Sequence, residues 1–135
     1  MSAPRAGERL PSVPLGSLDA DAVAGYARAS GDDNPVHLDA AAAEAIGLPG
    51  PVAHGMLVMG RLSRLVLQWR ADAVLEALEC RFTRPVPIGA ALSGEGRVAK
   101  VEEIAGGRRV VLRLLARDGE GTIAAMGEAT LRLGD

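Results

Sequence analysis

The chain has 135 residues, of which 48% are hydrophobic and 24% are charged, so it can bury a core and does not resemble a disordered polymer. A net charge of −2 and only three aromatic residues argue against a nucleic-acid-binding surface. Cys80 is the single cysteine, which excludes an internal disulfide and fits a reducing compartment.

The N-terminus carries no apolar stretch of signal-peptide length, and no window of about 18 apolar residues indicates a membrane span. We therefore expect a cytoplasmic protein without membrane contact. Residues 1–8 are polar and small, which is typical of a loose tail. No repeat or linker divides the rest, so the sequence predicts one domain over residues 1–135.

The first half of the chain predicts a short strand and two helices. Residues 9–15 contain two prolines, which lack the N–H of a ladder interior and therefore indicate an edge strand. Ser17 or Asp19 can cap a helix that runs to about residue 28, and Asp39 can cap a short alanine-rich helix. The latter helix should end near residue 46, before a glycine.

Residues 55–70 predict the longest helix. Apolar side chains cover most of its circumference, and its polar side chains form one narrow stripe at i, i+3 and i+7: Arg61, Arg64 and Gln68. Such a helix is expected to be buried by the rest of the domain on nearly every side.

From residue 74 onward the pattern changes to strands. Four are expected: Leu75–Thr83, Ala91–Glu103, Arg109–Arg117 and Gly121–Leu133. Clustered glycines at residues 105–107 and 118–121 favour hairpin turns, and the proline-rich residues 84–89 mark a bend or an edge. A meander of four antiparallel strands must cover the long helix, which predicts an α+β fold with the sheet curved around a central helix.

Both histidines of the chain lie near one polar turn. Gly31 can end the preceding helix, and Asn34-Pro35 enforces a turn, which places Asp32 and His37 on one stiff loop. Seventeen residues after His37, His54-Gly55 opens the long helix. On the loop alone, an ordinary solvated helix connection is the favoured interpretation, and the later motif blocks reverse that preference.

Three blocks resemble the MaoC-like (R)-specific enoyl-thioester hydratases and dehydratases: Tyr26-x-x-Ala29-Ser30-Gly31-Asp32-x-Asn34-Pro35-Val36-His37-x(5)-Ala43, Ala53-His54-Gly55-Met56-Leu57, and Arg81-Phe82-x-x-Pro85-Val86-x-x-Gly89. Their order and spacing agree with that family over residues 9–133. The resemblance implies the hot-dog fold, a curved antiparallel sheet wrapped around a long helix, and single-domain members include the catalytic subunit of a mycobacterial fatty-acid dehydratase. Ala29 departs from the family pattern, at a position that we interpret as packing.

The resemblance implies acid/base catalysis by Asp32 and His37 without a cofactor. Hydration of a 2-enoyl thioester needs a base for water, an acid for Cα and a donor for the thioester oxygen. Gly55, at a helix N-terminus, offers a backbone N–H as that donor, and Asn34 would brace the loop or bond within the site. Which of the two groups handles which proton stays open at this stage.

Weaker candidates lie around this set. His54 either shapes the substrate pocket or has a structural role, and Ser63, eight residues after Gly55, is a candidate substrate-binding hydroxyl. Four arginines are candidates for the phosphates of a carrier arm, although each is equally a solvated surface residue: Arg61, Arg64, Arg81 and Arg84. Two histidines seventeen residues apart and one cysteine do not provide the ligands of a zinc site, so no metal is expected.

The sequence thus predicts a hydratase/dehydratase that interconverts trans-2-enoyl and (R)-3-hydroxyacyl thioesters of coenzyme A or acyl carrier protein. The alternatives are an acyl-thioester hydrolase on the same fold and a non-catalytic subunit that binds acyl chains or completes a heterodimer. An exposed sheet edge and an open site favour a homodimer, or a heterodimer with another hot-dog chain.

Overall fold

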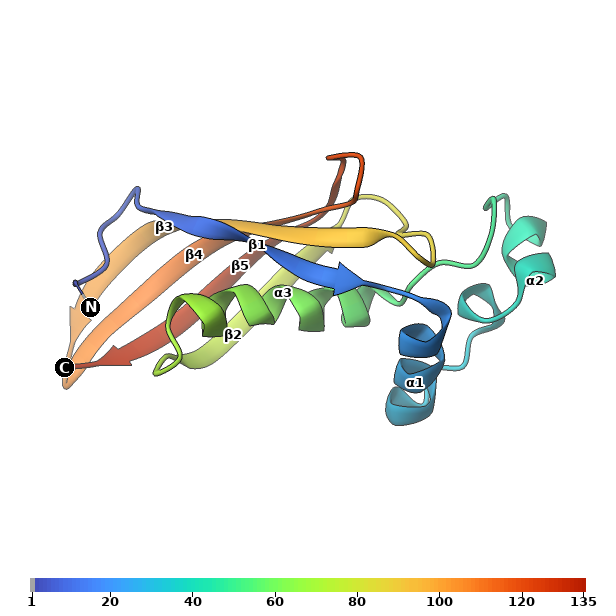
Figure 1. The fold of residues 1–135 in the computed structure, drawn as a ribbon. Coiled ribbons are helices and arrows are strands. Elements are labelled where there is room, and N and C mark those ends of the chain that lie inside the picture. Colours follow the sequence, from blue (N-terminus) through green and yellow to red (C-terminus); the bar gives the residue numbers. More distant parts are fainter. Residues whose placement is uncertain (1) are drawn as a thin grey trace.

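The computed structural model describes residues 2–135 and shows one curved sheet with a long helix against it (Figure 1). The elements in chain order are β1 (Arg9–Ser17), α1 (Ala20–Ser30), the 3-10 helix η1 (Pro35–His37), α2 (Ala40–Ala45), α3 (Gly55–Trp69), β2 (Val74–Phe82), β3 (Ala91–Ile104), β4 (Gly107–Arg117) and β5 (Ile123–Gly134). The expected helices and strands are confirmed, with shifts of at most two residues at their ends.

The five strands form one antiparallel sheet in the order β1-β3-β4-β5-β2. β1 is an edge strand, as its prolines predict. The expected four-strand meander is correct for β3, β4 and β5 but wrong for β2, which pairs with β5 at the opposite edge. Residues 83–90 are proline-rich and cannot continue a ladder. They cross instead from β2, at one edge, to β3, which lies next to the other edge. Within this crossover the Val86 carbonyl accepts the Ala53 N–H over 2.8 Å.

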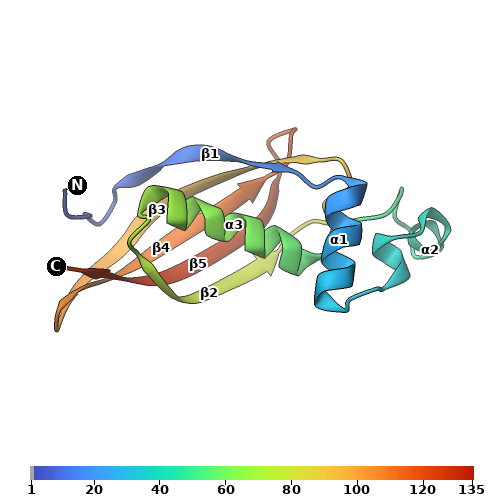
Figure 2. The ribbon, with the colours of Figure 1, turned by 60° about the horizontal axis from the view of Figure 1, so that its bottom comes forward.

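The core lies between α3 and the inner face of the sheet (Figure 2). α3 buries Val58, Leu62, Leu65 and Val66 against the inward side chains of β3, β4 and β5. Removing one such side chain from water contributes about 1.5–3 kcal/mol. The expectation that this helix is buried on nearly every side is wrong, because the sheet covers only one side of it. Met56 is 57% exposed and Leu67 is 48% exposed.

Glycines in the sheet make room for the helix. A Cβ at Gly96 would lie 3.0 Å from the Leu114 side chain and 3.3 Å from that of Leu65. A Cβ at Gly127 would lie 3.4 Å from the Leu62 side chain. The strands therefore approach α3 closely at these two points, which lets the sheet curve around it.

One arginine of the polar stripe on α3 has a structural role. The Arg61 guanidinium donates to the carbonyls of Leu15, over 3.0 Å, and Ser17, over 3.3 Å, and so ties α3 to β1. Burial, and next the neighbouring charge of Arg64, lower the pKa of Arg61. No helix among the described residues combines the length and apolar character that crossing a membrane requires.

Candidate active site

Local polar bonds shape the turn between α1 and η1. Gly31 ends α1 at φ 79°, a left-handed conformation that glycine adopts without strain. The Ser30 hydroxyl donates to the Tyr26 carbonyl over 2.7 Å and accepts the Asp32 N–H over 3.1 Å. Asn34 accepts the Val36 N–H over 3.1 Å and thereby caps η1. These bonds fix the backbone that carries the two acid/base candidates, and Asn34 braces the loop.

His37 lies in a defined orientation. Its Nδ1 is 2.7 Å from the carbonyl oxygen of Val52. Because a carbonyl only accepts, Nδ1 carries the proton and the opposite nitrogen, Nε2, keeps a lone pair. The Val52 N–H in turn donates to the Val36 carbonyl over 3.2 Å. Residue 52 therefore holds η1 with both its carbonyl and its N–H.

His54 is buried behind this residue, with 1% of its surface exposed. Its Nε2 is 2.9 Å from the Asp32 carbonyl oxygen, to which it must donate. The ring stacks on His37 with centroids 3.8 Å apart and planes inclined by 26°, and Tyr26 packs on it with centroids 4.8 Å apart. His54 Nδ1 has no hydrogen-bond partner within residues 2–135.

The structure therefore brings Asp32, His37 and His54 together. One polar atom from each of the three lies within 4.8 Å of the others. Stacked rings direct their in-plane lone pairs along similar rather than converging lines, which is a poor geometry for two ligands of one metal ion. A carboxylate beside an imidazole with a free lone pair suits proton transfer instead.

The first turn of α3 begins next to this cluster. Leu57 and Val58 donate their N–H groups to the His54 carbonyl. Within residues 2–135, the N–H groups of Gly55 and Met56 have no backbone acceptor. Free N–H groups and the positive end of the helix dipole together attract an oxygen that gains negative charge.

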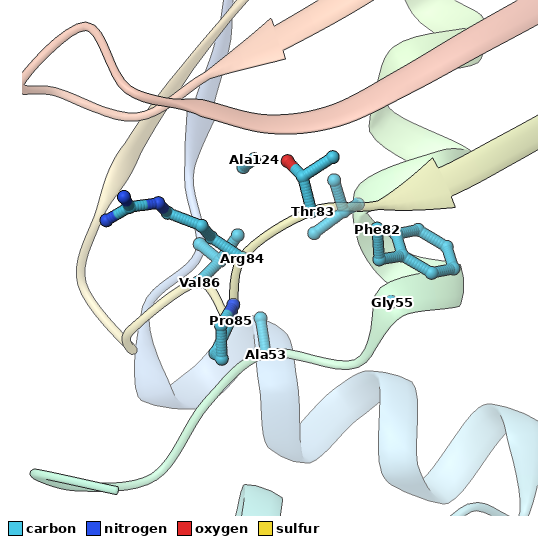
Figure 3. Close-up of a pocket in the computed structure, with 9 residues that line it drawn as sticks. Ala53, Gly55, Phe82, Thr83, Arg84, Pro85, Val86 and Ala124 are labelled. Atoms are coloured by element: carbon cyan, nitrogen blue, oxygen red, sulfur yellow. The ribbon is translucent and has the colours of Figure 1, made fainter.

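A cavity of about 320 Å³ opens on the other side of Gly55 (Figure 3). Most of the lining side chains are apolar, and Thr83 and Arg84 are the polar ones among them: Ala53, Gly55, Val58, Phe82, Thr83, Arg84, Pro85, Val86 and Ala124. The Phe82 ring lies directly beside Gly55, since a Cβ there would approach it to 2.9 Å. Asp32 and His37 do not line this cavity. Ala53 and Gly55 do, and both adjoin His54 in the chain, so the cavity and the polar cluster meet at residues 53–55.

The Ser63 candidate lies apart from the cluster. The Ser63 hydroxyl donates to the Gly60 carbonyl over 2.6 Å, which uses its proton within the helix. Ser63 is also about 12 Å along the helix axis from Gly55. Cys80 is half-buried, and burial raises the pKa of its thiol, so little reactive thiolate is present at neutral pH.

Sequence reasoning missed two parts of the site. The Val52 carbonyl sets the tautomer of His37, and the residue type at position 52 does not predict this, because every residue has a backbone carbonyl. Tyr26 packs on His54, a contact that no local sequence pattern predicts. The tyrosine opens the first motif block, which was the available signal for a role in the site.

Fold and site together define a class of protein: an α+β domain with a central helix and a cluster of one aspartate and two histidines at the N-terminus of that helix. The family model described as "MaoC like domain" matches residues 4–119. The chain therefore belongs to the MaoC-like hydratase/dehydratase family, as the motif blocks predicted.

Individual relatives agree. The chain is 30% identical over 113 residues to the (R)-specific enoyl-CoA hydratase of Aeromonas caviae, covering 82% of this chain and 83% of the relative. The solved structure of an (R)-hydratase from A. caviae superimposes with a TM-score of 0.87 at 27% identity, over 98% of this chain and 99% of that one. These values confirm the hot-dog fold.

Other similar proteins differ in size or assembly. The chain is 31% identical over 109 residues to the Saccharomyces cerevisiae fatty acid synthase subunit beta, covering 78% of this chain and spanning only 5% of that protein. A chain of the (3R)-hydroxyacyl-ACP dehydratase complex from Mycobacterium tuberculosis shares the fold, with a TM-score of 0.81 at 21% identity over 98% of this chain and 100% of that chain.

Proposed function

We propose that the protein is a cofactor-independent hydro-lyase that interconverts trans-2-enoyl and (R)-3-hydroxyacyl thioesters. The observation that carries this proposal is the fixed tautomer of His37. In the neutral ring, the Val52 carbonyl holds the proton on Nδ1 and leaves Nε2 free, near the Asp32 carboxylate. The ring stacks on His54, which precedes the first turn of α3. Names of similar proteins, including an (R)-specific enoyl-CoA hydratase, support the substrate class.

In the hydration direction, a water molecule lies between Asp32 and His37. The water oxygen attacks Cβ of the enoyl group while one of these two residues takes a water proton, and the electron pair of the double bond moves toward the thioester. That residue, now protonated, delivers the proton to Cα, while the other residue holds the water by a hydrogen bond. One hydrogen and one hydroxyl are thereby added, and both residues return to their starting protonation states. The geometry favours His37 Nε2 as the first acceptor, because its lone pair is free.

The negative charge that develops on the thioester oxygen needs a donor. The free Gly55 N–H provides one, and such a preorganised donor contributes about 3–4 kcal/mol to the transition state in other enzymes. The apolar cavity beyond Gly55 is the place that we propose for part of the acyl group or its thioester arm. Arg84, exposed at its edge, is available to a phosphate of that arm.

A second hot-dog chain would complete the site. The Asp32 side is open to solvent, and both sheet edges, β1 and β2, lack a further strand within the described residues. We propose a homodimer in which the second copy covers this opening. A heterodimer is the alternative, supported by the similar fold of a mycobacterial dehydratase complex.

The test is the loss of enoyl-thioester absorbance when purified protein is mixed with crotonyl-CoA, followed by chiral analysis of the product. Formation of the (R)-3-hydroxy product supports the proposal. Release of free thiol instead indicates the hydrolase alternative. If neither crotonyl-CoA nor a crotonyl carrier protein reacts with a well-folded protein, the non-catalytic alternative replaces the proposal.

A further inference from the structure

The outer face of the sheet, which points away from α3, carries one row of charged residues in direct register. β1 pairs with β3 at Arg9 and Arg97, β3 with β4 at Arg97 and Arg113, β4 with β5 at Arg113 and Glu128, and β5 with β2 at Glu128 and Glu79. All five side chains are exposed. Across the sheet the row therefore reads three positive charges followed by two negative charges.

This order is unfavourable within one molecule. Like charges directly opposite on neighbouring strands destabilise a sheet, and three of the four neighbouring pairs in the row carry like charges. The ion pairs that do form within residues 2–135 lie elsewhere: Arg108–Glu103, Arg117–Glu95, and Glu76 with Arg109 and Arg132. The row therefore contains one neighbouring pair of opposite charge, Arg113 and Glu128, but forms no ion pair within residues 2–135. It lies over a surface hollow of about 1060 Å³.

We propose that this face binds the same face of a second copy, around a twofold axis that runs along β4. Rotation about that axis reverses the order of the strands across the sheet. The row of one copy therefore faces the row of the other copy in the opposite order. Arg97 of one copy then faces Glu128 of the other, and Arg9 faces Glu79. The two Arg113 side chains meet at the axis, each flanked by a glutamate in its own sheet and one in the other.

No other arrangement of two copies about an axis in this plane gives the same match. An axis across the strands would place every residue of the row against itself, which brings like charges together. Aligned packing of two sheets, with strands within about 30° of each other, is an ordinary way to join such faces. In the neighbouring row, Leu115 on β4 lies on the axis and meets its own copy, whereas Met126 on β5, which is 47% exposed, faces Glu95 on β3 of the other copy.

A second copy fits better than an acidic partner of another kind. An acidic surface would compensate the three arginines but would leave Glu79 and Glu128 beside further negative charge. A second copy compensates both ends of the row at once. The contact uses the outer face and leaves both sheet edges and the opening at Asp32 free, so it does not depend on the proposed chemistry or on the chain that completes the site.

Charge exchange at the pair nearest the axis tests this contact. Molar mass is measured by light scattering after size exclusion in low-salt buffer, for the unmodified protein and for Arg97→Glu, Glu128→Arg and the double variant. Each single variant should halve the mass, because it places like charges in contact. The double variant restores the pairs with exchanged signs and should return to the original mass.

Arg64→Glu on α3 is the matched control, because it changes the net charge equally at an exposed site away from the sheet face. Its mass should not change. About 1 M salt, at which the screening length is about 3 Å, should reproduce the effect of the single variants. A monomeric unmodified protein, or equal masses in all variants, would overturn the proposal. Equal masses together with an Arg97-dependent complex with acyl carrier protein would assign the face to an acidic partner instead.

Discussion

The core around α3 and the polar turn that follows α1 are built by different forces. In the core, Leu62, Leu65, Leu112 and Leu131 expose at most 1% of their surface, and apolar burial holds them in place. In the turn, residues 30–35 are exposed and are held by hydrogen bonds between side chains and neighbouring backbone. The stabilising core and the proposed chemistry are therefore located in separate regions, which meet at His54 and the first turn of α3.

This difference has a consequence for mutations. A polar residue on the exposed turn buries little apolar surface, so its replacement should affect turnover and leave the free energy of unfolding nearly unchanged. A core leucine should behave in the opposite way. His54 lies where the two regions join, and its replacement should affect both quantities.

The largest effect is expected for the acid/base pair. Asp32→Asn and His37→Gln keep the size of each side chain but remove the proton acceptor, and each should lower kcat by about 10²–10⁴-fold. Thermal denaturation should show a melting temperature close to that of the unmodified protein. The exposed neighbour Asp33→Asn is the matched control for Asp32 and should retain activity. Full turnover in either variant of the pair would remove these residues from the mechanism.

Next in size is a core truncation. Leu62 on α3 is fully buried, and Leu62→Ala leaves a cavity against the sheet. The free energy of unfolding should fall by about 2–5 kcal/mol. Urea denaturation followed by circular dichroism measures this loss. Leu67→Ala, on the exposed side of the same helix, should cost far less. Equal losses in the two variants would mean that α3 is covered on both sides in solution.

A smaller effect is expected at His54, where two substitutions separate its two contacts. His54→Phe keeps a ring against His37 but removes the donor to the Asp32 carbonyl, whereas His54→Gln can keep a donor but removes the ring. A shift of the turn by about 1 Å can cost on the order of 10²-fold in rate, so each variant should lower kcat by roughly tenfold to a hundredfold.

The two variants are distinguished by nitrogen NMR of the His37 ring. In each folded variant, the Nδ1–H tautomer of His37 should persist, because the Val52 carbonyl sets it independently of His54. Lower kcat with little change in KM indicates that His54 positions the pair. A raised KM at unchanged kcat would contradict that role and indicate a contribution to substrate binding.

The regular elements could be predicted because each has a local signal. Helical spacing and a capping aspartate predicted α1, whose N-cap Asp19 accepts the Ala22 N–H over 2.8 Å. Alternation of apolar residues predicted β4 and β5. The pairing of β2 with β5 could not be predicted from the local sequence. It is decided by contacts between distant segments and by the crossover of residues 83–90.

For the site, the motif blocks indicated which residues matter, and the structure adds how they are oriented. No sequence pattern shows that the Val52 carbonyl fixes the His37 tautomer, because every residue has the same carbonyl. The burial of His54 under Tyr26 and His37 also depends on the packing of α1 against the start of α3. The catalytic roles of Asp32, His37 and Gly55 stay predictions.

The smallest effect is expected where the apolar cavity and the polar cluster join. Gly55→Ala keeps the backbone N–H but places a Cβ 2.9 Å from the Phe82 ring, which must move toward solvent or into the cavity. We expect kcat/KM to fall by about tenfold, equivalent to about 1.4 kcal/mol in the activation free energy. Gly60→Ala, in the same helix with open space around the new Cβ, should retain activity and gain about 0.5–1 kcal/mol of stability. Combining Gly55→Ala with Phe82→Ala removes the contact and should recover much of the loss. If the combined variant is as slow as Gly55→Ala alone, the glycine is needed for the approach of substrate to the backbone and not for the fit of Phe82.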